Sequence, residues 1–322
     1  MTTVLAGGVG AARLLRGMIC AVPAQEVTAI VNTADDVVLH GLSVSPDLDT
    51  VTYTLAEAIN SDTGWGLVDE TWQAMDTLER LGGSSWFRLG DRDLGTHLHR
   101  TGRLADGIGL AEITAEITRA WGIEARLLPM TEGHVSTMVT LADNNDVEEG
   151  SAGEEIGFQD YFVRLGHDVA VSAVRFAGID NASPGPGVLD AINSATSVVI
   201  APSNPIVSIG PIVALPGIGE ALASRRVDVV AVSPIINGSA LKGPAERMLR
   251  ELGHESSVIG VARLYRDFAA TLVVDTADAD LASDVEAEGM TCVVTPTVMT
   301  DLNVATELCR TILSPQSRLK VR

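Results

Sequence analysis

Short apolar runs alternate with longer helical segments along most of this chain, and that alternation limits the fold more than any other feature. Runs of this length suit strands that are buried on both faces, and the helices connect one strand to the next. This order is typical of an α/β protein with a doubly wound, mostly parallel sheet. We expect strands at 2–6, 29–31, 126–130, 197–201, 227–232 and 290–295.

One long segment interrupts the alternation with helical patterns alone. We interpret residues 61–122 as a helical insertion into a Rossmann-like α/β domain, which is made of residues 1–60 and 123–322. Within the insertion, the helical patterns cover 65–81, 96–101 and 110–121. Glycine-containing loops separate them.

The balance of charges excludes some partners. The chain has 322 residues, of which 46% are hydrophobic, and a formal net charge of −20. So acidic a chain is poorly suited to the phosphate backbone of a nucleic acid. No apolar run reaches the length of a membrane span, and the first residues lack the features of a signal peptide. We therefore expect a cytoplasmic protein with neither a nucleic-acid nor a membrane partner.

A glycine-rich turn separates the first strand from the first helix. Gly7, Gly8 and Gly10 lie in this turn, where backbone amides at a helix N-terminus can approach a phosphate. The dinucleotide-binding fingerprint is incomplete, because Arg13 stands where a small residue is needed. Close packing of the helix on the strand explains the glycines equally well.

The strand at 29–31 leads into a polar loop that carries carboxylates. Thr33, Asp35 and Asp36 follow the strand directly. In open α/β sheets, ligands bind at the carboxyl ends of the strands. Carboxylates there favour a hard cation such as Mg²⁺ beside phosphate groups. The alternative is that these are ordinary turn residues.

The same loop ends in a second pair of carboxylates, Asp47 and Asp49, which enclose Leu48. Asp49 and Thr50 open a predicted helix, so Asp49 is a candidate for an N-cap as well as for a site residue. A carboxylate at this junction can hold or deprotonate an attacking hydroxyl group.

Two further polar loops follow predicted strands. The loop 202–211 contains Ser203, Asn204 and Ser208, and the loop 233–244 contains Lys242. Only one other lysine exists, so an anionic ligand must rely on arginine, backbone amides, a metal ion or this residue. Lys242 precedes a predicted helix, where a cation is unfavourable unless an anion is bound. Convergence of these loops would suit phosphoryl or nucleotidyl transfer.

A polar segment in the insertion carries Arg88, Asp91, Arg92 and Asp93. The two arginines are a candidate fork for an anion. The alternative is a surface cluster of ion pairs with the two aspartates.

His97 and His99 lie close together in the insertion. Zinc needs three or four ligands, and the sequence offers no third ligand nearby. The sequence therefore does not predict a zinc site here.

The chain resembles the 2-phospho-L-lactate transferase family of coenzyme F420 biosynthesis over nearly its whole length. The most specific match is Asn-Thr-Ala-Asp-Asp-Val-Val-Leu-His-Gly-Leu-Ser-Val-Ser-Pro-Asp-Leu-Asp-Thr-Val-Thr-Tyr at 32–53. Further matches cover 5–17, 86–93, 201–212 and 233–236. The composition, rich in arginine and poor in lysine, is similar to that of actinobacterial members that transfer phosphoenolpyruvate.

This resemblance implies a Rossmann-like homodimer that requires Mg²⁺. The acceptor would be the deazaflavin Fo, and the donor a guanosine diphosphate ester of enolpyruvate or lactate. The terminal hydroxyl of the Fo ribityl chain would attack the phosphorus atom that carries the ester. GMP would leave, and dehydro-F420-0 or F420-0 would form.

The resemblance also implies roles for individual residues. Asp49 and Arg88 would bind Fo. From the positions of the carboxylates themselves, we expect Asp49 to be catalytic and Asp36 and Asp49 to hold the metal ion. The residues expected to bind the nucleotide are Gly7, Gly8, Gly10, Thr33, Asp35, Asp36, Ser203, Asn204, Ser208 and Lys242. The loop around Lys242 differs from the family, in which we expect more lysines.

Two other classes of protein remain open. A related family of non-catalytic regulators that bind nucleotide sugars shares the glycine turn and the Asp35-Asp36 pair. The Trp86–Asp93 segment and the helical insertion favour the transferase. An NAD-dependent oxidoreductase is the other alternative, and the mismatch at Arg13 argues against it.

Overall fold

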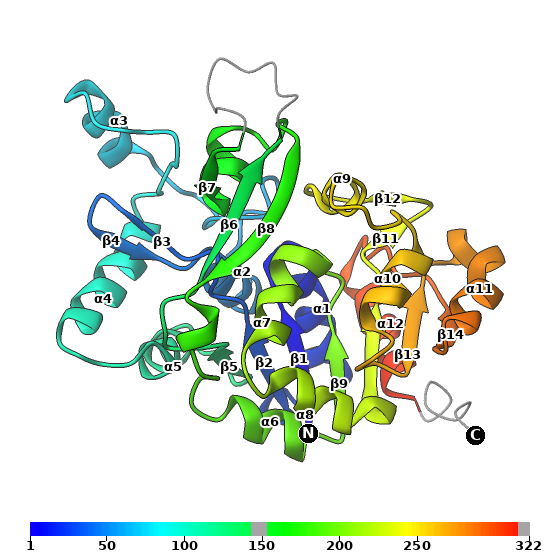
Figure 1. Cartoon of the computed structure of the whole chain (residues 1–322). Helices are drawn as coiled ribbons and strands as arrows, with labels where there is room; N and C mark the ends of the chain where they lie inside the picture. Colours follow the sequence, from blue (N-terminus) through cyan, green and yellow to red (C-terminus); the bar gives the residue numbers. More distant parts are fainter. Residues whose placement is uncertain (143–152, 315–322) are drawn as a thin grey trace.

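The computed structural model describes residues 1–142 and 153–314, and its centre is a parallel sheet of seven strands. The strand order is β14-β13-β10-β9-β1-β2-β5 (Figure 1). From β1 the chain adds β2 and β5 on one side, and it then adds β9, β10, β13 and β14 on the other side of β1. The direction in which strands are added therefore reverses between β1 and β9. The strands are β1 (Thr2–Ala6), β2 (Val27–Val31), β5 (Arg126–Pro129), β9 (Ser197–Ile200), β10 (Val229–Val232), β13 (Thr271–Val274) and β14 (Thr291–Val294).

Helices cover both faces of this sheet, as a doubly wound fold requires (Figure 1). Alternate residues of β1 enter opposite cores: Val4 packs in one cluster and Leu5 in the other. The first face carries α1 (Gly8–Ala21), α2 (Pro46–Leu55) and α12 (Leu302–Leu313). The second face carries α6 (Val188–Ser194), α7 (Gly210–Ala214), α8 (Ile218–Ser224), α9 (Ala245–Glu251), α10 (Val258–Tyr265) and α11 (Ala282–Ala287). The predicted α/β class is confirmed.

The segment predicted as a helical insertion contains α3 (Gln73–Arg80), α4 (Asp93–Ala105) and α5 (Leu110–Ala120), on the left of Figure 1. The helix expected over 65–81 begins later, because Gly64 and Gly66 adopt φ of +78° and +70° in the turns before it. The helix expected over 96–101 is longer and begins at Asp93.

The loop after β2 is more ordered than the sequence indicates. It contains a hairpin of β3 (Val37–Leu39) and β4 (Leu42–Val44), which turns through His40 and Gly41 at positive φ. Strand β4 packs against α4, so the hairpin joins the carboxylate loop to the insertion.

A separate antiparallel sheet contains β7 (Glu155–Gly157), β6 (Ser136–Leu141) and β8 (Val171–Ala177), in the order β7-β6-β8. The smaller elements are β11 (Ile235–Ile236), β12 (Ser239–Ala240), η1 (Ala24–Glu26), η2 (Asp160–Arg164), η3 (Ile179–Asn181), η4 (Pro205–Ile209), η5 (Arg226–Asp228) and η6 (Thr276–Leu281). In the part of the chain described here, no single helix is long and apolar enough to cross a membrane, although the bent pair Pro205–Ala214 and Ile218–Ser224 passes that test on length and composition.

Candidate functional site

The loops that follow β1 and β9 touch at the point where the strand order reverses. Ser203 Oγ donates a hydrogen bond to the carbonyl oxygen of Gly7 over 2.7 Å. A Cβ atom at Gly7 would lie 2.7 Å from Cβ of Ser208, and one at Gly10 would lie 2.3 Å from the carbonyl oxygen of Pro202. These two glycines are therefore required for close packing of the loops. Open α/β sheets bind ligands at such reversal points.

Asp47 closes this crevice from the side of α2. The backbone N–H of Gly8 donates to its carboxylate, and Asn32 Nδ2 donates to its Oδ2 over 3.0 Å. Asn32 Nδ2 also lies 3.0 Å from Oδ2 of Asp35, so one amide ties both carboxylates together. Burial raises the pKa of Asp47 to about 6. Neither Asn32 nor Asp47 was expected as a site residue. The available signal for Asp47 was its place in the same polar loop, two residues before Asp49.

Asp35 and Asp36 add two more carboxylates at the end of β2. Burial, and then repulsion from Asp47, raises the pKa of Asp35 well above its usual value. Burial likewise raises the pKa of Asp36, although Ser45 Oγ donates to it over 2.6 Å. The Oδ1 atoms of Asp35 and Asp36 are buried without a hydrogen-bond partner among the described residues. The arrangement therefore favours a cation beside these carboxylates.

Asp49 has a different environment from its neighbours. Helix α2 begins at Pro46 with Ser45 at the N-cap, so the alternative role of Asp49 as an N-cap is wrong, and Asp49 lies in the first turn. Its two carboxylate oxygens accept hydrogen bonds from Nη1 and Nη2 of Arg100 on α4. Arg100 is almost fully buried, which disfavours its charge, yet Asp49 raises its pKa above the usual value. The carboxylate of Asp49 and the guanidinium of Arg100 therefore neutralise each other.

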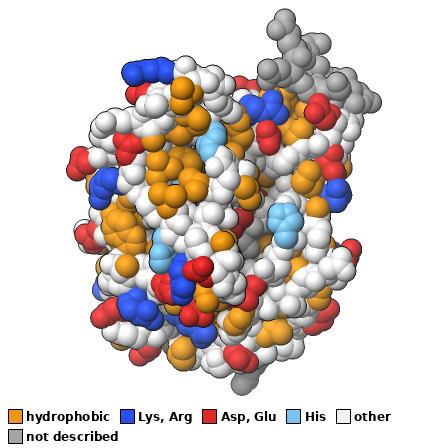
Figure 2. Space-filling model, turned by 90° about the vertical axis from the view of Figure 1, so that its left-hand side faces the viewer, with side chains coloured by type: hydrophobic (Ala, Val, Ile, Leu, Met, Phe, Trp, Pro, Cys, Tyr) orange, Lys and Arg blue, Asp and Glu red, His pale blue; other side chains and the backbone are white. Residues whose placement is uncertain are grey.

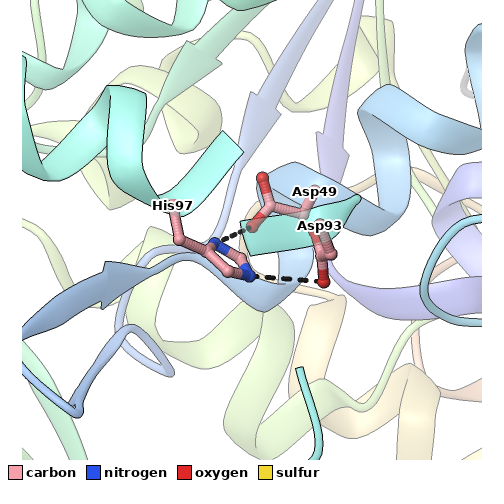
Figure 3. A group of neighbouring side chains, drawn as sticks. All are labelled: Asp49, Asp93 and His97. Atoms are coloured by element: carbon pink, nitrogen blue, oxygen red, sulfur yellow. Dashed lines mark ion pairs between the residues drawn. The ribbon is translucent and has the colours of Figure 1, made fainter. Parts of the chain in front are cut away.

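Asp49 also belongs to a group that could hold a metal ion (Figure 3). One ligand atom each from Asp49, Asp93 and His97 lies within 4.8 Å of the others. His97 Nε2 is 3.2 Å from Oδ2 of Asp93, and Nδ1 is 3.7 Å from Oδ2 of Asp49. The sequence did not reveal this triad, because Asp49 is far from α4 along the chain. Asp93 and His97, four residues apart on a helix, were a recognisable pair.

Arg88 lies in a different part of the insertion. Its guanidinium forms an ion pair with Asp76 at 2.7 Å and lies over the ring of Trp72, 5.1 Å from the centroid. Arg92 donates instead to the carbonyl oxygen of Val68. The structure therefore shows neither an arginine fork nor the alternative, ion pairs of these two arginines with Asp91 and Asp93.

The surface around Arg88 is partly apolar. Trp65 packs edge-on against Trp72 with ring centroids 6.3 Å apart, and Trp65 is 48% exposed. Figure 2 shows the side of the molecule that carries the insertion, where hydrophobic side chains gather in patches between charged ones. Such an apolar surface beside a guanidinium suits an aromatic ligand with acidic groups.

Lys242 brings the loop after β10 to the glycine turn. A Cβ atom at Gly64 would lie 3.2 Å from Nζ of Lys242 and 3.5 Å from Cγ1 of Val9 in the first turn of α1. The lysine therefore points toward the N-terminus of α1.

The remaining predicted residues have local structural contacts. Asn204 caps η4, since its side chain accepts from the N–H groups of Ile206 and Val207. Thr33 is buried, and its carbonyl oxygen accepts from the N–H of Asp36. Thus the glycine turn, both predicted loops and the carboxylates converge, whereas the contacts of Arg88 lie within the insertion.

Comparisons with known proteins identify the fold and the family of this chain. A solved structure of a UPF0052 family member from Bacillus halodurans shares the fold, with a TM-score of 0.62 and 18% identity over 97% of this chain and 98% of that chain. A phosphoenolpyruvate transferase from Kitasatospora aureofaciens is 44% identical over 313 residues, which cover 96% of each chain. One from Mycolicibacterium smegmatis is 39% identical over 318 residues, again 96% of each chain.

The family comparison covers almost the whole chain. A sequence profile of the family described as 2-phospho-L-lactate transferase CofD matches residues 2–313. That match spans both halves of the sheet, the insertion and every loop of the site. The chain therefore belongs to the 2-phospho-L-lactate transferase CofD family and is an enzyme of this transferase kind.

Proposed function

We propose that the enzyme transfers a phosphoenolpyruvyl or 2-phospholactyl group to the deazaflavin Fo in coenzyme F420 biosynthesis. The donor is a guanosine diphosphate ester of the three-carbon acid, and the products are dehydro-F420-0 or F420-0 and GMP. The observation that carries this proposal is the convergence of the glycine turn, the carboxylates and Lys242 in a chain that belongs to this family.

The nucleotide side of the site is the crevice at the reversal of strand order. The loops at Gly7–Gly10 and 202–208 line it, and Lys242 extends toward it. In this proposal, Lys242 and the first amides of α1 receive the diphosphate. Ser208 lies against Gly7, and Asp35 is joined to Asp47 at the crevice through Asn32. Asn204 and Thr33 make contacts within the two loops.

A magnesium ion fits the donor set at this crevice. The unpaired buried oxygens of Asp35 and Asp36 are hard ligands of the kind that Mg²⁺ prefers. Of the two ligands that we expected, Asp36 remains the proposed one, whereas Asp49 would have to share its oxygens with Arg100. When bound, the ion would neutralise charge on the diphosphate and on the departing phosphate.

The acceptor side begins at Asp49. Because Arg100 fixes both carboxylate oxygens, Asp49 has a defined orientation toward a hydroxyl group that enters beside α2. The ribityl oxygen forms a bond to the phosphorus that carries the acid, the bond from this phosphorus to the bridging oxygen breaks, and GMP keeps that oxygen. Asp49 orients the hydroxyl and accepts its proton. Arg88 binds the acidic deazaflavin ring beside Trp72.

The test is a direct assay with the purified enzyme, Fo and each guanylated acid in turn, followed by mass spectrometry of the product. Formation of dehydro-F420-0 or F420-0 together with GMP supports the proposal and identifies the acid. Binding of nucleotide sugars without turnover of any guanylated acid would favour a regulator instead. We also propose a cytoplasmic homodimer, which light scattering during size-exclusion chromatography would test.

A further inference from the structure

Polar side chains of α2 and α4 meet in a buried position beside the crevice. Buried contacts between helices are usually apolar, because a polar group that loses water without gaining a partner is costly. The side chains at this contact must therefore satisfy one another. Five of them lie at the spacing of successive helical turns and form what we call the α2–α4 cluster: Asp49 and Tyr53 on α2, and Asp93, His97 and Arg100 on α4.

His97 lies at the centre of this cluster, between the two carboxylates (Figure 3). Its Nδ1 atom is 3.3 Å from Nη1 of Arg100. A guanidinium only donates hydrogen bonds, so Nδ1 is the acceptor and the neutral ring carries its proton on Nε2. Nε2 faces Oδ2 of Asp93 over 3.2 Å. Both ring nitrogens therefore have protein neighbours, and neither is left for a metal ion.

Asp93 holds the far side of the histidine ring. Tyr53 donates from its hydroxyl group to Oδ1 of Asp93, and the backbone N–H of Asp93 donates to Oε1 of Glu70 over 2.8 Å. Burial alone would raise the pKa of Asp93, but hydrogen bonds from His97 and Tyr53 hold it below the usual value. Asp93 is therefore a charged and fixed acceptor for the ring N–H.

Arg100 connects the histidine to Asp49. Its Nη1 atom is 3.2 Å from Oδ2 of Asp49 and 3.2 Å from the carbonyl oxygen of Ser43, and Nη2 donates to Oδ1 of Asp49. The guanidinium is planar and moves as one unit, so an acceptor at Nη1 also restricts Nη2. A continuous series of contacts thus runs from Asp93 through His97 and Arg100 to the carboxylate of Asp49.

We propose that His97 is a positioning residue of the transfer reaction: it holds the Arg100 guanidinium in the orientation that presents the Asp49 carboxylate to the attacking hydroxyl group. This inference rests on the proposed function, since it needs Asp49 beside that hydroxyl. It also gives the helical insertion, which supplies α4, a part in the reaction. A misplacement of about 1 Å at a reacting group can cost roughly 10²-fold in rate, so indirect support of this kind has a measurable effect.

Two substitutions of His97 test the proposal in steady-state kinetics. His97→Leu removes both ring nitrogens, so kcat should fall roughly 10²-fold while KM changes little. His97→Asn can place its amide oxygen where Nδ1 lies, so it should recover most of the lost kcat. His99→Leu, an exposed histidine on the same helix, is the matched control and should leave kcat and KM unchanged.

His97→Leu should still fold, which thermal melting checks. Arg100 keeps Ser43 and Asp49 as partners in this variant, and Asp93 keeps Tyr53.

A double variant distinguishes positioning from a general weakening of the fold. If His97 acts through Asp49, His97→Leu should lower kcat no further when it is introduced into Asp49→Asn. A general weakening would lower kcat by the same factor in both backgrounds. An unchanged kcat in His97→Leu, or additive losses in the double variant, would overturn the inference.

Nitrogen NMR of isotope-labelled histidine gives a readout that needs no turnover. The signal of His97, assigned by its loss in His97→Asn, should show the Nε2–H tautomer and should shift in Arg100→Gln. The Nδ1–H tautomer, or an unchanged signal in Arg100→Gln, would overturn the inference whatever the substrates are. Absence of product from Fo and every guanylated acid with the unmodified enzyme would instead contradict the proposed function.

Discussion

Two groups of carboxylates in the same loop have opposite electrostatic environments. Asp49 shares its charge with Arg100 and needs no further cation. Asp35, Asp36 and Asp47 have raised pKa values, and hydrogen bonds from Asn32 and Ser45 compensate them only in part. The difference indicates that the charge of Asp49 is compensated before any ligand binds. Asp35, Asp36 and Asp47 instead obtain their counter-charge from a ligand.

The two environments favour one of the two candidate positions for a metal ion. The triad of Asp49, Asp93 and His97 has suitable spacing, but Arg100 already binds both oxygens of Asp49. A metal ion there would have to share Asp49 with a buried guanidinium. The carboxylates beside the glycine turn have no such competitor, and the diphosphate of the proposed donor would approach from their side.

Removal of divalent metal is expected to have the largest effect. Without a cation, the buried carboxyl groups of Asp35, Asp36 and Asp47 offer the diphosphate no counter-charge, so we expect turnover to fall to background in excess EDTA and to return with Mg²⁺. The measurement is the rate of product formation, with calcium and manganese as comparison ions. Full activity in EDTA would show that the carboxylates work without a metal.

Breaking the compensated pair is expected to have the next largest effect. Asp49→Asn should reduce turnover by roughly 10²–10⁴-fold, the usual contribution of general acid–base catalysis. It should also lower the free energy of unfolding by about 3–5 kcal/mol, because it leaves the Arg100 guanidinium buried without its partner.

A double variant separates the two effects. Asp49→Asn with Arg100→Gln removes both charges, so stability should recover while turnover stays low. Asp106→Asn, an exposed aspartate at the end of α4, is the control and should change neither quantity. Recovery of turnover in the double variant would contradict a direct role of Asp49 in the reaction.

The uncompensated group should make the stability of the metal-free protein depend on pH. The pKa of Asp47 is about 6 in the folded protein and 3.8 in the unfolded chain, so the folded protein keeps the Asp47 proton up to a higher pH than the unfolded chain does. The contribution to stability is then complete below about pH 4 and is lost as the pH rises through about 6. Thermal melting in EDTA should show this loss, and Mg²⁺ should restore more stability at neutral than at acidic pH. Asp47→Asn should make the melting temperature in EDTA depend less on pH. If the dependence on pH is unchanged in this variant, other titrating groups cause it.

Much of the fold follows from local sequence patterns. The apolar runs that became β1, β9 and β10 are continuous and short, and each is bounded by turn residues, so periodicity alone was sufficient. The β3–β4 hairpin was missed because its strands have three residues each and its turn uses His40 at positive φ, which sequence does not favour.

The site was predictable only where its residues follow strands. Asp35 and Asp36 could be placed because the end of β2 fixes them. The partners of Asp49 could not, since Arg100 is 51 residues away and its contact depends on how α4 packs against β4. Asp47 was visible in the motif, but its burial against the glycine turn depends on contacts between separate elements.

The smallest effect is expected at Arg88, which is partly exposed and outside both groups of carboxylates. Arg88→Ala should weaken Fo binding by about 1–3 kcal/mol, the range for hydrogen bonds to charged groups, and should leave GDP binding unchanged. Deazaflavin fluorescence during titration measures the first quantity and calorimetry the second. Arg80→Ala, an exposed arginine in the last turn of α3, is the control and should bind Fo normally. Asp76→Ala sharpens the test: it frees Arg88 from its ion pair and should not weaken Fo binding if the guanidinium contacts the ligand. Loss of GDP binding with intact Fo binding in Arg88→Ala would instead place Arg88 on the nucleotide side.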